Sequence, residues 1–368
     1  MDPRLDRLHR VAASRASLVS LAGGLPAAEL LPHAAIAAAS ADLRPDGERD
    51  PLQYGWPEGD LALRTWIAER MKARGAPVSP DDVVITAGAQ QALTLCAGMW
   101  PAGARIAIDR ETYPAAIETL AMAGHRLADD DAGDDVRYVI DGVSNPHGVD
   151  RVGPRRAALL ARGVPLIVDE AYVDLRFDGR VARPLWADAP DRVWHVGSFS
   201  KIVGPGLRVG WLIPPRARRD EVLAHKRAAD LQTGSFAQAV LARWLAVADY
   251  DGLVERARNL YQARAERLVA SLRRHLPGWR TVAPEGGLSL WVETDLCGDD
   301  VDLLEAAVAH GVAVDPGGMF RAAPVADAPT ALRLSFSHAP YGQLDEGVRR
   351  LARAALAYRR GHHHARAA

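Results

Sequence analysis

Two polar segments in the middle of the chain contain residue types that could do chemistry together. They are Asp169-Glu170-Ala171-Tyr172 and Ser198-Phe199-Ser200-Lys201, and each directly follows a short apolar run. A carboxylate, a tyrosine three residues later and a Ser-x-Ser-Lys about thirty residues further on match the needs of pyridoxal phosphate (PLP). That cofactor requires a lysine for a Schiff base, a carboxylate opposite its pyridine nitrogen, and a hydroxyl-rich, cationic cradle for its phosphate.

Three further polar segments follow other apolar runs. Residues 86–91, Thr-Ala-Gly-Ala-Gln-Gln, lead into a predicted helix whose free N–H groups could bind an anion, although a tight strand-to-helix turn explains them equally well. Residues 144–148 read Ser-Asn-Pro-His-Gly, and residues 204–208 read Gly-Pro-Gly-Leu-Arg. Because ligands of open α/β sheets bind at the carboxyl ends of the strands, we expect these segments to meet at one edge.

The elements that must position these segments alternate between strand and helix. Helical spacing of apolar residues predicts helices at residues 59–74, 90–99, 115–123 and 155–161. The alternation is typical of an α/β fold with a mostly parallel sheet flanked by helices. Short apolar, β-branched runs predict its strands at residues 83–86, 105–108, 136–140, 166–168, 193–196 and 209–213.

The character of the sequence changes after about residue 248. An Arg- and Glu-rich helix at 253–275 precedes strands at 288–293 and 332–336, a helix at 302–309 and a last helix ending near Tyr358. We therefore expect a large PLP-binding domain at residues 45–250. Residues 1–44 and 251–368 would form a smaller α+β domain, which includes an N-terminal helix with Leu5, Leu8 and Val11 on one face.

The overall composition excludes several classes of function. The 368 residues are 48% hydrophobic and 25% charged, and the formal net charge is −1, so no global field would attract nucleic acid or an anionic membrane. No apolar run approaches the roughly 20 residues that span a bilayer. Cys96 and Cys297 lack the spacing of metal or redox sites. We expect a cytoplasmic protein with reduced thiols, no metal and no membrane or nucleic-acid partner.

Taken together, the motifs resemble the fold-type-I PLP enzymes of the class I/II aminotransferase family. The similarity is greatest to the branch of 2-aminoadipate and kynurenine aminotransferases and the catalytic half of MocR-type regulators. It runs from about Gly23 to Ser337 and implies an aspartate aminotransferase-like fold with a seven-stranded sheet and a smaller α+β domain. The matching segments are GGLP, LQYGWPEGDLALRTWIAERM, VVITAGAQQALTL, ETYP, SNPHG, VDEAYVDLRFDG, VGSFSKIVGPGLRVGWL, EGGLSLWVE and LRLSFS.

The resemblance implies catalytic roles for particular residues. Lys201 would carry the cofactor and then move the proton between substrate Cα and the cofactor. Asp169 would keep the pyridine nitrogen protonated, so that the ring can accept electrons from a carbanion. Tyr172 and Asn145 would hydrogen-bond the ring's 3′ oxygen, and Tyr113 would stack on the ring face.

The resemblance also implies how the phosphate and the substrate are bound. Arg333 would clamp the substrate α-carboxylate, helped by Asn145 and the Gly24 backbone. Tyr54 would reach the phosphate of a neighbouring subunit, which implies a homodimer with shared active sites. The phosphate cradle of each subunit's own chain would consist of Gly88, Ala89, Gln90, Ser198, Ser200 and Arg208.

The implied activity is transfer of an amino group between an L-amino acid and a 2-oxo acid, in amino-acid metabolism. The same residues could serve β- or γ-elimination, or oxygen-dependent oxidation, because these reactions share a carbanion. A non-catalytic PLP-binding regulator is a third interpretation, and the presence of Lys201, Asp169 and Arg333 together argues against it. MocR-type regulators carry a helix-turn-helix domain ahead of the catalytic half, whereas this match begins within about twenty residues of Met1.

Two residues could affect the choice of substrate, and the sequence does not decide how. The family usually has threonine where His147 stands, and this histidine could touch substrate, although we expect a solvent-facing turn residue. Glu29 follows the GGLP turn and could favour a basic amino acid, although an exposed loop position is the simpler interpretation. The sequence does not identify the amino donor or the acceptor.

Overall fold

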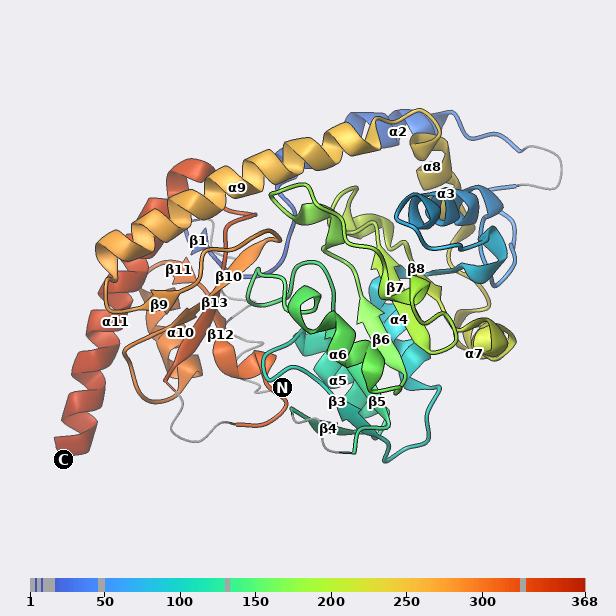
Figure 1. Cartoon of the computed structure of the whole chain (residues 1–368). Coiled ribbons are helices and arrows are strands. Elements are labelled where there is room, and N and C mark those ends of the chain that lie inside the picture. Colours follow the sequence, from blue (N-terminus) through green and yellow to red (C-terminus); the bar gives the residue numbers. More distant parts are fainter. Residues whose placement is uncertain are drawn as a thin grey trace.

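The computed structural model describes Arg4, Leu8 and residues 17–45, 50–129, 133–324 and 329–367. Leu5 and Val11, on which the predicted N-terminal helix depends, lie outside the described residues. Figure 1 shows two parts, each built around its own sheet, with the long helix α9 (Tyr250–His275) extending across both.

In the described part of the chain, seven strands form the larger sheet in the order β2-β8-β7-β6-β5-β3-β4. β8 runs antiparallel to β2 and β7, and the other neighbouring pairs are parallel, which confirms the predicted fold class. The strands are β2 (Val84–Thr86), β3 (Arg105–Ala107), β4 (Arg126–Ala128), β5 (Val136–Ile140), β6 (Leu166–Asp169), β7 (Val193–Ser198) and β8 (Gly210–Ile213).

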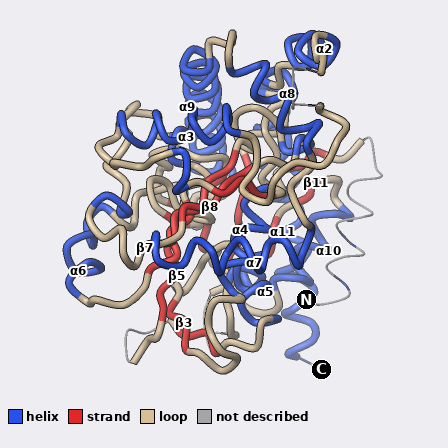
Figure 2. Tube along the Cα trace, turned by 90° about the vertical axis from the view of Figure 1, so that its right-hand side faces the viewer, coloured by secondary structure: helices blue, strands red, loops and turns tan. Residues whose placement is uncertain are grey.

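Successive residues of a strand point to opposite faces of the sheet. Both faces of this sheet are buried, each in its own apolar cluster. Val84, Ile167 and Val196 pack in one apolar cluster, whereas Ile85 and Val168 belong to the other. Figure 2 shows the strands as a band between α6 on one side and α4, α5 and α7 on the other. The helices of this part are α3 (Leu61–Ala73), α4 (Gly88–Ala97), α5 (Pro114–Met122), α6 (Arg156–Ala161), α7 (Arg219–Asp230) and α8 (Ser235–Leu245). Helix α2 (His33–Ala41) precedes them in the chain and packs against α8.

The smaller part contains an antiparallel sheet in the order β12-β13-β10-β9 and a short parallel pair, β1 with β11. Helices α10 (Asp300–Ala309) and α11 (Leu344–Ala367) pack with α9 around it. The pairing of β10 with β13 sets Trp291 opposite Arg333. The strands are β1 (Val19–Ser20), β9 (Arg280–Thr281), β10 (Ser289–Glu293), β11 (Val312–Ala313), β12 (Asp315–Pro316) and β13 (Ala331–Ser335).

Several elements were not predicted from the sequence. Strands β1, β4, β9, β11 and β12 were missed, and each has only two or three residues. Helix α7 is polar, with Val222, Leu223 and Lys226 as its buried residues, so its apolar stripe is weak. The last helix continues past the predicted end at Tyr358 to Ala367.

None of the described helices combines the length and the apolar composition needed to cross a bilayer. The described residues also contain no cluster of three or more His, Cys, Asp and Glu side chains that could hold a metal ion.

Candidate active site

The polar segments that follow the strands meet in one pocket at the carboxyl edge of the larger sheet. Asp169 and Ser198 are the last residues of β6 and β7, and Asn145 lies in the loop that follows β5, as expected for a parallel sheet. The pocket and its solvent-open mouth together span about 610 Å³. Its lining residues are Ala89, Gln90, Tyr113, Ile140, Asn145, Asp169, Ala171, Tyr172, Ser198, Ser200, Lys201, Pro205 and Arg208.

Lys201 projects into this pocket from the turn that follows β7. Its Nζ donates a hydrogen bond to the Gly24 carbonyl oxygen at 3.0 Å and lies 5.5 Å from the centre of the Tyr172 ring. Burial of the ammonium, together with the positive charge of Arg333, lowers the pKa of Lys201 to about 8. A small fraction of this lysine is therefore a neutral, nucleophilic amine at pH 7, and this fraction rises steeply as the pH approaches 8.

Asp169 is held rigidly at the end of β6. The Tyr138 hydroxyl donates to its Oδ2 at 3.0 Å, and the Ala171 N–H donates to its Oδ1 at 2.9 Å. The Asp169 side chain is buried, and burial raises its pKa above the ordinary value. Tyr138 was not predicted as a site residue, because a buried tyrosine within an apolar strand has no distinguishing sequence signal.

Two tyrosines and an asparagine surround the space above the carboxylate. Tyr113 immediately precedes α5 and Tyr172 follows β6, and burial raises the pKa of each to about 12, so both hydroxyls stay protonated. Asn145 is buried and precedes Pro146 in a cis peptide bond. The three side chains thus line one pocket, as the sequence predicted.

A compact turn at residues 87–90 joins β2 to α4 and forms one end of the pocket. Gly88 has a φ of +76°, and a Cβ there would lie 2.6 Å from Arg208 Nη2, so the turn requires glycine. Arg208 itself adopts a left-handed φ of 53°, and its Nη2 donates to the Ala87 carbonyl at 3.2 Å. Backbone N–H groups at the start of α4 and a guanidinium therefore converge here, as in anion sites.

Hydroxyl groups complete this end of the pocket. The Ser198 hydroxyl donates to Ser200 Oγ at 2.9 Å and accepts from the Ser200 N–H at 3.1 Å. Gln90 lines the pocket, but its side-chain amide donates to Thr119 Oγ1 at 2.6 Å, so that amide is engaged with α5.

Arg333 lies beside the pocket on β13 and is fixed by two side chains. Its Nε and Nη2 donate to Asp315 Oδ2 at 3.0 and 2.7 Å, and its Nη1 donates to Asn145 Oδ1 at 3.0 Å. The Gly23 N–H donates to the same Asp315 oxygen at 2.8 Å. Asp315 was not predicted as a site residue, although an acid directly after the apolar run at residues 312–314 is the signal that identified Asp169.

Tyr54 stands apart from the site in the single chain. Its side chain is 78% exposed and is not among the residues that line the pocket. Leu52 and Trp56, on the same segment, are also strongly exposed.

The two residues that could affect the choice of substrate, His147 and Glu29, both contact other side chains. His147 is not the solvent-facing turn residue that we expected: its side chain is 20% exposed, Nε2 lies 3.5 Å from Glu111 Oε2, and the ring packs 5.4 Å from Trp291. Tight packing between the two parts of the molecule replaces solvent at this position. Glu29 is exposed as expected, and it also pairs with Arg264 of α9.

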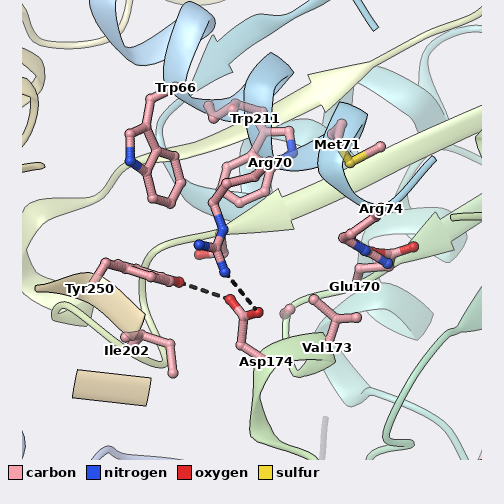
Figure 3. A pocket seen from close by; sticks show the side chains of 13 residues that line it. Trp66, Arg70, Met71, Arg74, Glu170, Val173, Asp174, Ile202, Trp211 and Tyr250 are labelled. Carbon is pink, nitrogen blue, oxygen red and sulfur yellow. Dashed lines mark hydrogen bonds and ion pairs between the residues drawn. The ribbon is translucent and has the colours of Figure 1, made fainter. Parts of the chain in front are cut away.

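A second pocket of about 520 Å³ shares Ala171 and Ser198 with the first, and Figure 3 shows its side chains. Tyr250 donates to Asp174 at 2.8 Å, beside an Arg70–Asp174 pair at 3.5 Å. Arg74 Nη1 lies 2.6 Å from Glu170 Oε2. Burial opposes the charge of Glu170, but Arg74 outweighs it, so the pKa of Glu170 lies below its ordinary value. These pairs attach α3 and α9 to the segment that carries Asp169.

The residues present fit a PLP cofactor. A lysine with a lowered pKa and a buried carboxylate face one pocket, and a glycine turn with an adjacent arginine lies at its end. This donor set supplies an amine, a partner for a pyridinium and an anion cradle, which are the groups that PLP requires.

Comparison with known proteins identifies the family. Residues 126–351 match the family model described as aminotransferase class I and II. The chain is 31% identical to aromatic-amino-acid aminotransferase 1 of Thermococcus litoralis, covering 91% of this chain and 87% of the relative. It is also 31% identical to 2-aminoadipate transaminase of Thermus thermophilus, covering 92% and 90% respectively.

A solved structure agrees with these sequence matches. The α-aminoadipate aminotransferase of Thermus thermophilus, in complex with N-(5′-phosphopyridoxyl)-L-leucine, superposes with a TM-score of 0.85 at 30% identity. The superposition covers 96% of this chain and 94% of that structure. The chain therefore belongs to the class I and II aminotransferase family, and it is a transferase that uses PLP to transaminate amino acids.

Proposed function

We propose that Lys201 is the residue that carries PLP and that the pocket around it is the catalytic centre. The single observation that carries this proposal is a lysine of lowered pKa in the same pocket as a buried carboxylate. When bound, the cofactor supplies an electron sink that makes the substrate Cα–H acidic.

The chain's own residues would orient the reactants and move the proton. Asp169, fixed by Tyr138 and Ala171, would hold a proton on the pyridine nitrogen through a charge-assisted hydrogen bond. The amine of Lys201, once displaced by substrate, would act as the base that takes the Cα proton and returns it. Tyr172 would hydrogen-bond the ring's 3′ oxygen because its hydroxyl stays protonated.

Residues around the ring would hold the rest of the cofactor. We assign Tyr113 to the ring face and Asn145 to the 3′ oxygen beside Tyr172. The phosphate would lie at the turn of residues 87–90, where α4 begins and Arg208 approaches. The assigned phosphate ligands are Gly88, Ala89, Gln90 through its backbone, Ser198, Ser200 and Arg208.

Arg333 would bind the α-carboxylate of the substrate. Asp315 and Asn145 hold its guanidinium in one orientation, so little conformational entropy is lost when a carboxylate binds. The Gly24 carbonyl accepts a hydrogen bond from Lys201 Nζ at 3.0 Å, and we assign the Gly24 backbone a part in binding the same carboxylate. We expect L-amino acids as donors and 2-oxo acids as acceptors.

We also propose a homodimer in which Tyr54 reaches the phosphate of the other subunit. Leu52, Tyr54 and Trp56 are all more than three-quarters exposed in the single chain, and a second copy would cover them. The proposed large domain is residues 45–250, and residues 1–44 with 251–368 would form the smaller one. We propose a cytoplasmic location, where Cys96 and Cys297 would stay reduced.

A donor panel tests the proposed activity. Purified holoenzyme is mixed with single L-amino acids under nitrogen, including an aromatic amino acid and 2-aminoadipate, because those names describe two relatives. We expect the visible absorption band of the bound cofactor to disappear and the matching 2-oxo acid to form in equal amount. Release of ammonia without an equal loss of the cofactor's visible band, or oxygen uptake in air, would contradict transamination. A Lys201→Ala variant that keeps a normal visible band would contradict the assignment of the lysine.

A further inference from the structure

Lys226 on α7 is a lysine whose side chain is completely buried next to the proposed phosphate site. It is one of only three lysines among the 45 Lys and Arg residues of the sequence, together with Lys72 and Lys201. Arginine is thus the usual cation of this chain. A compact ammonium with three donors fits a small polar cage that a planar guanidinium would not.

The cage around this ammonium consists of three residues. Lys226 Nζ donates to Gln91 Oε1 at 3.1 Å and to Thr233 Oγ1 at 3.0 Å, and it lies 3.0 Å from both carboxylate oxygens of Asp230. The Asp230 carboxylate balances the ammonium charge. The network therefore fixes the positions of the groups around it and adds no net positive charge.

Gln91 connects this cage to the turn at residues 87–90. Its Oε1 accepts from the Ala87 N–H at 2.8 Å as well as from Lys226, and its Nε2 donates to Asp230 at 2.6 Å. These contacts fix which end of the amide faces the turn. Ala87 is thus held at both of its backbone groups: its N–H donates to Gln91, and its carbonyl accepts from Arg208.

The other arm of the cage holds the strand that leads into the same turn. The Thr233 hydroxyl, which accepts from Lys226, donates to the Ile85 carbonyl of β2 at 3.2 Å. Lys226 is therefore linked through one intermediate residue to Ile85 and to Ala87, both of which lie within the three residues that precede Gly88. That glycine adopts a φ of +76°, and a Cβ added to it would lie 2.6 Å from Arg208 Nη2.

We infer that Lys226 is a positioning residue for phosphate binding: through Gln91 and Thr233 it fixes the turn at residues 87–90 in the shape that receives the cofactor phosphate. The inference rests on the proposed placement of the phosphate at this turn. Replacing the ammonium by an apolar group frees the Gln91 amide to rotate. It also leaves the Asp230 carboxylate unbalanced near a phosphate dianion, so both effects weaken phosphate binding.

The test compares two ligands that differ only in the phosphate. Dissociation constants of PLP and of pyridoxal, which lacks the phosphate, are measured by absorbance titration of the apoprotein for wild type and Lys226→Met. We expect Lys226→Met to weaken PLP binding by about tenfold or more, as for loss of a charge-assisted contact, while pyridoxal binding changes less than about twofold. A purely structural role would weaken both ligands equally. Equal losses, or no loss for either ligand, would overturn the inference.

Two further variants control this test. Lys72→Met makes the same substitution at an exposed position of α3 and should leave both constants unchanged. If Lys226→Met does not fold by circular dichroism, Gln91→Leu cuts the connection to Ala87 while Lys226 keeps Asp230 and Thr233. It should show the same selective loss, and an equal loss or none would again refute the inference. Failure of the wild type to bind PLP would instead contradict the proposed function.

Discussion

At the scale of single residues, the site depends on how burial and neighbouring charges change the protonation of side chains. Burial and Arg333 lower the pKa of Lys201 to about 8, whereas burial raises the pKa of Tyr172 to about 12. The two groups therefore have opposite proton states in weakly alkaline solution. One can act as a nucleophile and base, and the other remains a hydrogen-bond donor.

The lowered pKa of Lys201 predicts how the apoprotein captures PLP. Attack on the cofactor aldehyde requires the neutral amine, whose fraction rises about tenfold per pH unit below the pKa. We expect the capture rate, followed by stopped-flow absorbance, to rise up to a pH of about 8 and then level off. A rate that keeps rising to a pH near the ordinary lysine value of 10.5 would contradict this assignment.

Asp315 predicts a separation between substrate binding and cofactor binding. Asp315→Asn weakens two charge-assisted contacts to Arg333 and leaves PLP contacts untouched. We expect KM for both the amino donor and the 2-oxo acid to rise about tenfold, with an unchanged dissociation constant for PLP. Asp220→Asn, at a side chain that is 99% exposed, is the matched control. Unchanged KM values would show that Asp315 does not orient Arg333.

At the scale of elements, the junction between β2 and α4 is the most constrained part of the site. Glycine is required at position 88 by a positive φ and by the approach of Arg208. The same junction is held from outside by Gln91, so the start of α4 keeps its N–H groups directed at the pocket.

Substituting this glycine should weaken phosphate binding directly. Gly88→Ala puts a Cβ 2.6 Å from Arg208 Nη2 and adds roughly 1–2 kcal/mol of left-handed backbone strain. We expect PLP affinity to fall by about tenfold or more, measured by absorbance titration. Gly342→Ala, where an added Cβ meets nothing within 4 Å, should behave as wild type. Equal affinities of the two variants would contradict a constrained phosphate turn.

Much of the sheet and its pocket could be predicted from the sequence, because apolar runs followed by polar residues mark buried strands and their carboxyl ends. Lys201, Asp169 and Tyr172 were predicted in this way, and they share one pocket. Tyr138 and Lys226 were not, since their roles depend on three-dimensional neighbours far away in sequence. His147 was misjudged because the sequence does not show that Glu111 and Trp291 surround it.

At the scale of the whole molecule, the proposed homodimer would cover an exposed apolar segment. Leu52, Tyr54 and Trp56 project from the segment before α3, and Gln232, which follows α7, accepts a hydrogen bond from Gly55 within it. The segment is thus attached to the loop that also carries Thr233. Association of two chains and retention of PLP should therefore be linked.

This arrangement predicts that breaking the dimer releases PLP. We expect sedimentation velocity to give twice the mass of one chain for the wild type. Trp56→Glu should shift this mass toward the monomer, because a buried unpaired carboxylate is costly, and should weaken PLP binding in parallel. Met122→Glu, at another strongly exposed apolar residue, is the control and should change neither property. A wild-type monomer that holds PLP normally would contradict a shared site.

The most direct test of the account is to locate the cofactor on the chain. Borohydride reduction of the holoenzyme fixes PLP to the amine that holds it, and peptide mass spectrometry then identifies the residue. Because Lys72, Lys201 and Lys226 are the only lysines in the sequence, the experiment has three possible positions. We predict the phosphopyridoxyl group on the peptide that contains Lys201 alone. Label on Lys72 or Lys226, or on no lysine, would contradict the central claim.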